Sequence, residues 1–279
     1  MIGQLLKHGF ALKVAALICV ICILHFGGDV SYAKADSPPQ KSAVIVDALK
    51  AQPWQEVQPG FDAIRAITQE GLVFSAYRFS PKQFELSIEL QSDAKGERVD
   101  MVGERIKHAL LVVNAGFFFD QDSKLYSTGY LRLGGKTLSK GWRDAGGFLS
   151  LKADGPELSA AKKGTPIGDF DVLQSKPMLI EPDGKWAMLS NRVRMKRRTI
   201  LCRMSNGEFI IAMITRVGAS LFEAGWIMRS KDDGGYFGCD SALAMDGGGS
   251  SQIWVRGYPQ FSHRGLTPVH NFLVVSRKK

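Results

Sequence analysis

One carboxylate followed by three glycines and two serines is the part of this chain best suited to chemistry. The run 246–251 follows an alternating apolar stretch, 242–245, which predicts a strand. Consecutive glycines can turn their backbone N–H groups toward one anion, and serine hydroxyls add further donors. Asp246 stands at the edge of this nest, which favours chemistry on a phosphorylated substrate. The alternative is a tight hairpin in which the glycines only form the turn.

Two further polar residues have side chains that suit a phosphate or a sugar. Asn114 follows the apolar run 110–113 and precedes Gly116, where the backbone can turn and let a ligand approach. Its amide can donate and accept hydrogen bonds, although a turn asparagine needs no ligand. Arg198 carries a planar fork that matches phosphate, with a solvated surface charge as the alternative. Thr199 either orients the site or is only a β-branched strand residue.

Four segments in order resemble the phosphodiester glycosidase domain, a family that includes the lysosomal uncovering enzyme and secreted bacterial proteins. The resemblance covers residues 70–277, nearly the whole chain after the leader. It rests on 112–118 (VVNAGFF), 174–179 (QSKPML), Arg198-Thr199, and 238–251 (GCDSALAMDGGGSS). Lys176 stands where a small residue is more usual, which leaves room for lost or altered activity.

The resemblance implies hydrolysis of a sugar-1-phosphodiester to free sugar and a phosphomonoester. Glycosidases ordinarily use two carboxyl groups, but a phosphate leaving group departs with little protonation, so one can suffice. We expect Asp246, Asn114 and Arg198 to be catalytic, with Asp246 as nucleophile or as base toward water. The residues expected to bind substrate or phosphate are Gly116, Gln174, Thr199, Gly247, Gly248, Gly249, Ser250, Ser251 and His270. His270 has a structural alternative, since a lone strand histidine often serves packing.

Three other acidic residues could assist Asp246, and each has a simpler explanation. Asp240 could only start a strand, Asp120 could be a loop residue, and Glu223 fits a helix capping box with Ser220. No cofactor is required by the sequence, although Asp246 and backbone carbonyls could hold a divalent cation. The sequence contains no Cys-x-x-Cys and no His-x-x-x-His, so a structural zinc site has no support.

The amino terminus predicts export. Basic residues precede an apolar segment, 14–24, and small-residue sites around 31–35 follow, which is the layout of a signal peptide. The apolar core is shorter than the ~20 residues of a membrane span, so an uncleaved anchor is the lesser alternative. We expect a periplasmic or secreted protein that begins near Lys34 or Asp36 and touches a membrane only through an uncleaved leader.

Two cysteines remain after such a cleavage, Cys202 and Cys239. In an oxidising compartment they could pair, and two buried free thiols are the alternative. Spacing alone does not choose between them, because a disulfide depends on the separation of the two Cα atoms.

The net charge of +9 suits anionic ligands or an anionic cell envelope. The basic residues are spread out, and the one dense run, 192–198, has no nucleic-acid motif around it, so we expect no nucleic-acid partner. The expected partner is a glycan or sugar-phosphate substrate.

The patterning predicts a strand-rich α+β fold, a single domain with a mixed β-sheet and a few packed helices. We expect a leader over 1–35, a linker and extension over 36–69, and the domain over 70–279. Runs 71–79 and 84–90 alternate around a Ser-Pro and predict a hairpin. A helix opening at Ser220, between a strand over 208–214 and one over 242–245, predicts a β-α-β unit that places Asp246 beyond a strand's carboxyl end.

Further strands are expected over 110–113, 148–151 and 271–275, and a helix over 98–107. Two functions beside the hydrolase stay open at this point. One is a non-catalytic periplasmic module that binds phosphorylated glycan through the same nest. The other is a phosphodiesterase that cuts the P–O bond and releases sugar phosphate.

Overall fold

The computed structural model describes residues 37–191 and 194–279, within a compact unit that spans Ala33–Lys279. The expected leader, residues 1–35, lies outside the described residues. None of the helices within these ranges has the length and apolar character that a membrane crossing requires.

The largest element is an eight-stranded antiparallel sheet. In spatial order its strands are β1 (Gln55–Gln58), β2 (Phe61–Ile67), β3 (Val73–Phe79), β16 (Phe209–Ala219), β15 (Lys196–Met204), β17 (Cys239–Ala244), β13 (Met178–Glu181) and β14 (Lys185–Trp186).

Three smaller sheets complete the strand content of the described residues. The four-stranded sheet has the order β18 (Ile253–Val255), β5 (Ala109–Asn114), β19 (Asn271–Arg277) and β4 (Phe84–Leu90). The five-stranded sheet has the order β11 (Gly155–Ala160), β10 (Gly147–Lys152), β12 (Asp171–Ser175), β8 (Leu131–Leu133) and β9 (Lys136–Ser139). The remaining pair is β6 (Phe118–Gln121) with β7 (Lys124–Ser127).

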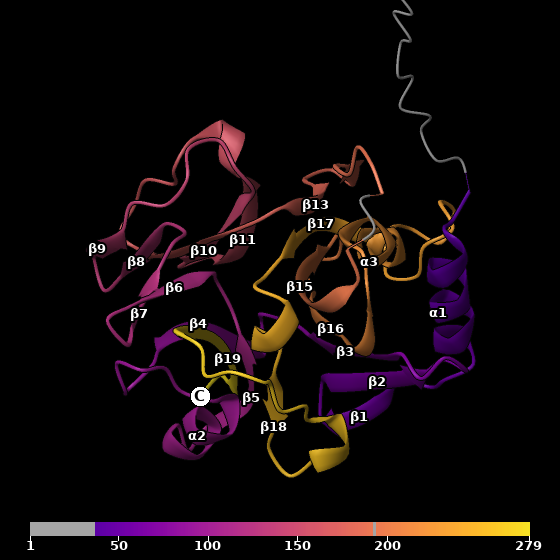
Figure 1. The fold of residues 1–279 in the computed structure, drawn as a ribbon, viewed down its shortest axis with the longest axis horizontal. Helices are drawn as coiled ribbons and strands as arrows, with labels where there is room; N and C mark the ends of the chain where they lie inside the picture. Colours follow the sequence, from indigo (N-terminus) through magenta and orange to yellow (C-terminus); the bar gives the residue numbers. More distant parts are fainter. Residues whose placement is uncertain (1–36, 192–193) are drawn as a thin grey trace, which may run out of the picture. The chain divides into compact units, whose positions relative to one another are not determined.

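The helices lie on the outer faces of the sheets (Figure 1). They are α1 (Gln40–Lys50), α2 (Val99–Arg105) and α3 (Leu221–Met228), with short 3-10 turns η1 (Ala161–Lys163), η2 (Gly248–Ser250) and η3 (Pro259–Phe261). The buried residues of α1 and α3 pack on one face of the large sheet, and those of α2 pack on the four-stranded sheet.

Alternation along each strand of the large sheet divides the core into two layers. Leu201 points into the cluster shared with the four- and five-stranded sheets, whereas its neighbours Ile200 and Cys202 point toward α1 and α3. Because successive side chains point to opposite faces, one strand supplies both layers. Odd-numbered β15 residues such as Thr199 therefore face the space between the sheets.

The α+β single-domain fold is confirmed, and most of the expected elements are present. The expected helices correspond to α2 and α3, and α3 carries the predicted capping box between Ser220 and Glu223. The strands expected over 110–113, 148–151, 208–214, 242–245 and 271–275 correspond to β5, β10, β16, β17 and β19.

Two details of the expected sheet were wrong. Each strand pair in the described residues is antiparallel, so the sheet is not mixed; β16 and β17 run parallel but have β15 between them. The runs 71–79 and 84–90 form no hairpin, because β3 pairs with β2 and β16 while β4 pairs with β19 in another sheet. Alternating runs report burial, and they do not identify the pairing partner.

The segment taken as a linker and extension folds with the domain. The residues after the leader form α1, β1 and β2, and β2 pairs with β3 across the boundary placed at residue 70. Phe61 and Ile64 are fully buried in two different core clusters, which ties this segment into both layers.

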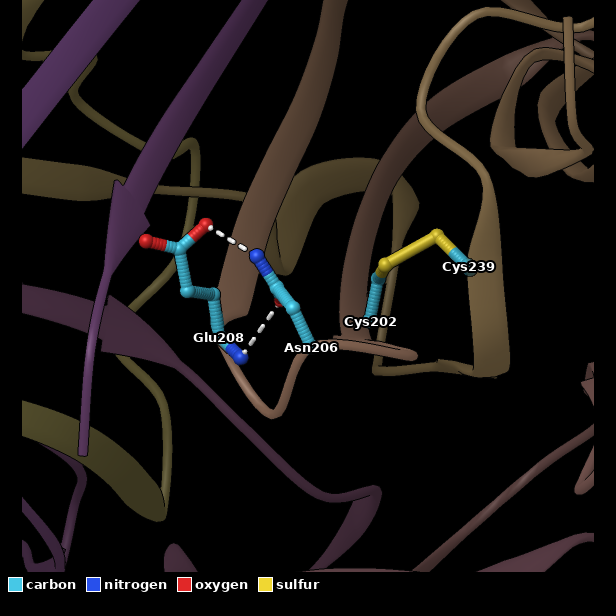
Figure 2. The surroundings of a disulfide bond; sticks show 4 residues. All are labelled: Cys202, Asn206, Glu208 and Cys239. Atoms are coloured by element: carbon cyan, nitrogen blue, oxygen red, sulfur yellow. Dashed lines mark hydrogen bonds between the residues drawn. A yellow bond between two sulfur atoms is a disulfide. The ribbon is translucent and has the colours of Figure 1, made fainter. Parts of the chain in front are cut away.

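Cys202 and Cys239 form a disulfide, so the paired alternative holds (Figure 2). Their Cα atoms are 5.8 Å apart on the neighbouring strands β15 and β17. In this pairing Cys239 is opposite Met204, two residues along β15 from Cys202. The bond fixes the start of β17 against β15, and β17 leads directly to Asp246.

Candidate active site

The glycine-rich run connects two sheets and is not a hairpin. Strand β17 ends at Ala244 in the eight-stranded sheet, and β18 begins at Ile253 in the four-stranded sheet. Asp246 lies just past the carboxyl end of β17, as expected, and Gly248–Ser250 form a single 3-10 turn with Gly248 at φ 64°. Only glycine adopts this left-handed conformation without strain, so the turn requires Gly248.

Asn114 anchors the backbone on both sides of the glycines. Its Nδ2 donates to the Asp246 carbonyl at 2.7 Å, while its Oδ1 accepts from Thr199 Oγ1 at 2.9 Å and from Gln252 N at 3.1 Å. The Ser251 hydroxyl lies 3.2 Å from Thr199 Oγ1. Both lone pairs of the amide oxygen are therefore used by the protein.

These contacts join the predicted Asn-Gly, Arg-Thr and Asp-Gly segments in one cluster. Asn114, Thr199 and Ser251 are at most 1 % exposed, so they form the floor of the site. Ser251 was expected to bind phosphate, but its hydroxyl is buried beneath the nest. Its contact with Thr199 instead holds the chain that follows the nest.

Burial controls the charge of Asp246. Loss of solvent raises the pKa of its carboxyl group, and the Ser250 hydroxyl, the Gly247 N–H and the Lys196 charge partly oppose that rise. The Gly247 N–H donates to Asp246 Oδ1 at 2.8 Å. A carboxylate whose pKa is raised by burial is a stronger base or nucleophile than a solvated one, which suits the predicted catalytic role.

The nest presents backbone donors beside this carboxylate. Across the described residues, the N–H groups of Gly248 and Gly249 have no assigned acceptor. A Cβ atom at Gly248 would lie 3.8 Å from Lys196 Cδ, and the charge of this exposed lysine acts on Asp246, so Lys196 adds a cation near the nest. Two N–H groups and an ammonium are a recognised combination for holding phosphate.

Arg198 lies beneath the nest and is mostly used by the protein itself. Its Nε donates to the Ala219 carbonyl at 2.8 Å and its Nη2 to the Arg194 carbonyl at 2.6 Å. Its Nη1 would be 4.0 Å from a Cβ atom at Gly247. Burial lowers the pKa of the guanidinium, and Glu223 opposes the shift. Of the three guanidinium nitrogens, Nη1 is the one that lies toward the glycines, so Arg198 does not present its full bidentate face to a ligand there.

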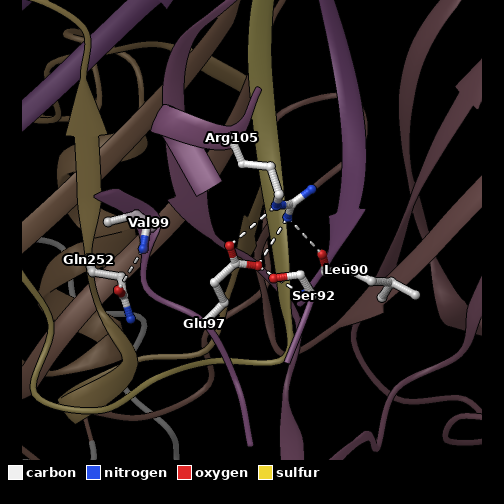
Figure 3. A network of polar contacts seen from close by, with 6 residues as sticks. All are labelled: Leu90, Ser92, Glu97, Val99, Arg105 and Gln252. Carbon is white, nitrogen blue, oxygen red and sulfur yellow. Dashed lines mark hydrogen bonds and ion pairs between the residues drawn. The ribbon is translucent and has the colours of Figure 1, made fainter. Parts of the chain in front are cut away.

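Gln252 ties the end of the nest to two other segments. Its Oε1 accepts from Val99 N at 3.1 Å (Figure 3). Its Nε2 donates to the carbonyls of Ser250 and Thr267 at 3.2 and 2.9 Å. The buried Glu97 beside it pairs with Arg105 at 3.0 Å and accepts from Ser92 N at 2.8 Å. This network secures the start of α2 against the segment behind the nest.

Gly116 and His270 meet through Asn271. The Asn271 Oδ1 accepts from Gly116 N at 2.6 Å, and its Nδ2 lies 3.0 Å from His270 Nδ1. A Cβ atom at Gly116 would lie 3.3 Å from Asn271 Oδ1, so this turn is tightly enclosed. Burial lowers the pKa of His270 to about 4, so its imidazole is neutral at neutral pH. His270 therefore supports the Asn114–Gly116 turn through Asn271.

Gln174 organises the wall next to this turn. Its Oε1 accepts from Tyr130 N and Trp142 N at 3.0 and 2.9 Å, and its Nε2 donates to the carbonyls of Trp142 and Ala145 at 2.8 and 3.0 Å. The amide is thereby fully used by the protein, and Gln174 shapes the loop that carries Trp142.

The comparisons with known proteins place the chain in a family. The sequence model described as phosphodiester glycosidase matches residues 107–276, more than half of the chain, and this range contains each of the predicted site residues. The chain belongs to the phosphodiester glycosidase family. No curated protein matches the chain.

Three solved structures share the fold of this phosphodiester glycosidase family member at 14 % sequence identity. The first is the zebrafish N-acetylglucosamine-1-phosphodiester alpha-N-acetylglucosaminidase catalytic domain, auto-inhibited by its pro-peptide, with a TM-score of 0.56 over 84 % of this chain and 93 % of that one. A hypothetical protein from Synechocystis has a TM-score of 0.55, covering 88 % and 65 %. A Burkholderia pseudomallei protein described as exported has a TM-score of 0.55, covering 74 % of each chain.

The three alternative carboxylates have structural roles. Glu223 accepts from Ser220 N at 2.7 Å in the capping box, Asp240 pairs with Arg203 at 3.1 Å, and Asp120 accepts from Ser123 N in the exposed β6–β7 turn. Glu223 is close enough to Arg198 to act on its pKa, but its carboxylate is used by the cap, whereas the Asp246 carboxylate lies within the glycine turn itself. The described residues contain no group of three or more His, Cys, Asp or Glu arranged for a metal ion, and a cation held by Asp246 with backbone carbonyls stays a prediction.

Sequence reasoning missed three residues that the structure brings to the site. Lys196 adds a cation beside Gly248, Gln252 fixes the end of the nest, and Asn271 accepts from Gly116 N. Each is adjacent, or nearly so, to a predicted residue, and a polar side chain next to a predicted motif was the available signal.

Proposed function

We propose that this protein is an exported hydrolase that cleaves the glycosidic bond of a sugar-1-phosphodiester, giving free sugar and a phosphomonoester. The observation that carries the proposal is the partly buried Asp246 carboxylate at the edge of a glycine nest whose backbone is fixed by Asn114. The nest and the carboxylate share one short turn, so an anion bound to the N–H groups lies next to the group that would do chemistry.

The phosphoryl group binds at the Gly248 and Gly249 N–H groups, with Lys196 as counter-charge. These donors stabilise the negative charge that grows on the leaving phosphate as the glycosidic bond breaks. Asp246 then acts on the anomeric carbon as nucleophile, or deprotonates the water that attacks it. No second carboxyl group is required, because the leaving phosphate is only weakly basic.

An aromatic wall offers a place for the sugar. Phe117 follows Gly116 directly and packs edge-on against Trp142 with ring centroids 5.8 Å apart. Lys176 Nζ lies 4.0 Å from the centre of the Trp142 ring, which accounts for a lysine at this unusual position. Sites for small ligands commonly combine apolar walls with a few polar groups, and the Phe117–Trp142 pair would supply such a wall.

The disulfide supports export. Cys202 and Cys239 are paired, and such bonds persist in oxidising compartments outside the cytoplasm. Together with the signal-like leader, this favours a periplasmic or secreted protein, and the Burkholderia structure with the same fold is described as exported.

The proposal is tested with the purified protein and a hexose-1-phosphate methyl diester. We expect free hexose and methyl phosphate as products, and Asp246→Asn should lower kcat by a factor of about 10² or more. Asp120→Asn is the matched control, because Asp120 lies in an exposed turn, and it should leave kcat unchanged.

Other outcomes identify the alternatives. Hexose-1-phosphate as the first product would indicate P–O cleavage. Binding of the diester without turnover would indicate a glycan-binding module. Near-normal turnover in a folded Asp246→Asn protein would remove the catalytic assignment.

A further inference from the structure

A small cavity beside the candidate active site carries cationic side chains and no acidic one. Its volume is about 160 Å³, and it lies between β2, β3, the end of β16 and the segment after η3. The polar residues that line it include Arg65, Ser75, Thr215, Arg216 and His263. Among the described residues that line it, none is Asp or Glu.

Its cations have no counter-charge within the described part of the chain. Within the described residues, 37–191 and 194–279, neither Arg65 nor Arg216 takes part in an ion pair or a side-chain hydrogen bond. The His263 Nε2 is buried there without a hydrogen-bond partner. Buried polar atoms are nearly always satisfied, so an orphan nitrogen among arginines calls for a ligand or for water.

The state of His263 fits a donor to an anion. Burial, and then the charges of Arg197 and Arg216, lower the pKa of its imidazole. A neutral imidazole still carries one N–H, which can sit on Nε2 and point at a bound oxygen. A negative ion would also remove the repulsion between His263 and its two arginine neighbours.

A bulge in β16 brings Arg216 to the cavity. Lys196 pairs with Ala219 whereas Arg198 pairs with Ile214, so β16 has extra residues between these two positions. Within that bulge Arg216 has φ 63°, a left-handed conformation that costs a non-glycine residue free energy. Residues kept in such conformations concentrate at functional sites, and Arg216 is exposed, so a ligand can reach it from solvent.

The cavity and the candidate active site share one row of the large sheet. Arg65 pairs with Ser75, Ser75 with Met213, and Met213 with Thr199. Side chains of directly paired residues lie on the same face, and strands are ~4.8 Å apart, so Ser75 is roughly 10 Å from Thr199. The cavity is therefore a neighbour of the Asn114–Thr199 floor and is built from different side chains.

We propose that this cavity binds a phosphoryl group, with Arg65, Arg216 and His263 as charged or N–H donors and the hydroxyls of Ser75 and Thr215 as further partners. Its volume is several times the ~30 Å³ that one water molecule occupies, which leaves room for a tetrahedral oxyanion. Arginine forks bind such oxygens bidentately, which is the strongest recognition available to these side chains. The same chemistry serves a free phosphate ion and the phosphoryl end of a larger ligand.

The test uses the full-length protein and the imidazole NMR signals of His263, assigned by their loss in His263→Gln. Inorganic phosphate should shift these signals saturably. The apparent Kd should rise roughly tenfold or more in Arg65→Gln and in Arg216→Gln, since each loses a charge-assisted contact. Arg264→Gln is the matched control: it removes the same charge from the exposed residue next to His263 and should leave the Kd within about twofold.

The outcomes divide cleanly. Methyl phosphate that binds like inorganic phosphate indicates the phosphoryl end of a larger ligand, whereas binding of inorganic phosphate alone indicates the free ion, and both support the site.

His263 signals that do not move with phosphate would overturn the proposed phosphoryl site, leaving a water-filled cavity. An equal loss in Arg264→Gln would also overturn it, because the effect would then follow net charge. Binding at the glycine nest does not depend on Arg65, so the failure of one site is distinguishable from the failure of the other.

Discussion

Asn114 and Arg198 show how a side chain predicted to meet a ligand can act through the backbone. The sequence predicted both as catalytic, because their types and motifs suit a polar site, and that role stays a prediction. It could not show that three of the Asn114 hydrogen bonds go to the protein, or that Arg198 Nε and Nη2 donate to backbone carbonyls. Those partners are 21 to 138 residues away for all but the Arg194 carbonyl, and no local pattern encodes them.

His270 makes a prediction about pH. Its pKa is about 4 in the folded protein against 6.5 for an unperturbed histidine, so below pH 6.5 the unfolded state binds a proton that the folded state does not. The contribution to the free energy of unfolding is complete above pH 6.5 and is lost as the pH falls toward 4. We expect a loss on the order of 2 kcal/mol from this group, measured by urea unfolding from pH 7 to 4.5.

His270→Gln should make that pH dependence shallower, while His108→Gln, at an exposed position, should leave it unchanged. His263 also has a lowered pKa. It therefore adds to the same pH dependence of the free energy of unfolding in wild type, His270→Gln and His108→Gln. The same slope in wild type and His270→Gln would show that His270 is not held neutral by burial.

The glycine-rich crossing is the element that decides the site. The sequence predicted the strand before it and the position of Asp246, but it left a hairpin open. A hairpin and a crossing between sheets begin with the same residues, and what separates them is that β18 pairs with β5. That pairing joins segments about 140 residues apart, which short-range alternation does not report. The predicted hairpin at 71–90 was wrong for the same reason.

Gly247 and Gly249 offer a matched pair for this element. A Cβ atom at Gly247 would lie 2.8 Å from the Arg197 carbonyl oxygen, a backbone atom that cannot move without shifting β15. At Gly249 the nearest atoms would be 3.6 to 3.8 Å away, which is ordinary contact. We expect Gly247→Ala to lower the free energy of unfolding by about 1–3 kcal/mol and kcat by roughly tenfold or more, and Gly249→Ala to change both little.

Thermal or urea unfolding gives the stability of Gly247→Ala and Gly249→Ala, and turnover of the diester gives their kcat. Equal effects of the two substitutions would mean that the close approach of Gly247 to β15 does not shape the nest.

At the scale of the whole molecule, sequence patterning gave the fold class and most of the elements around the site. It did not give four separate sheets, because it counts strands and does not assign them partners. It also began the domain too late, at residue 70, because the polar Ser-Pro-Pro stretch over 37–39 is typical of a linker, whereas α1, β1 and β2 lie before that boundary. The cysteine pair could not be decided from spacing, and the adjacent strands β15 and β17 supply the missing proximity.

The disulfide makes a prediction at this scale. It closes a loop of sequence separation 37, and in the chain-entropy account such a closure stabilises the folded state by roughly 3–4 kcal/mol. Replacing both Cys202 and Cys239 by alanine should lower the free energy of unfolding by about this amount. In urea, the free energy of unfolding of the double variant should not change with reductant, whereas that of the wild type should fall when reductant is added. Wild-type unfolding that does not respond to strong reductant at equilibrium would contradict a stabilising bond.

The central claim is that Asp246 directs water to the sugar carbon and not to phosphorus. Hydrolysis of the hexose-1-phosphate methyl diester in ¹⁸O-labelled water tests it directly, because the label reports which bond breaks. We predict methyl phosphate without ¹⁸O, formed by wild type and slowed by about 10² or more in Asp246→Asn. A phosphate product that contains ¹⁸O would contradict the account, since it would mean attack at phosphorus.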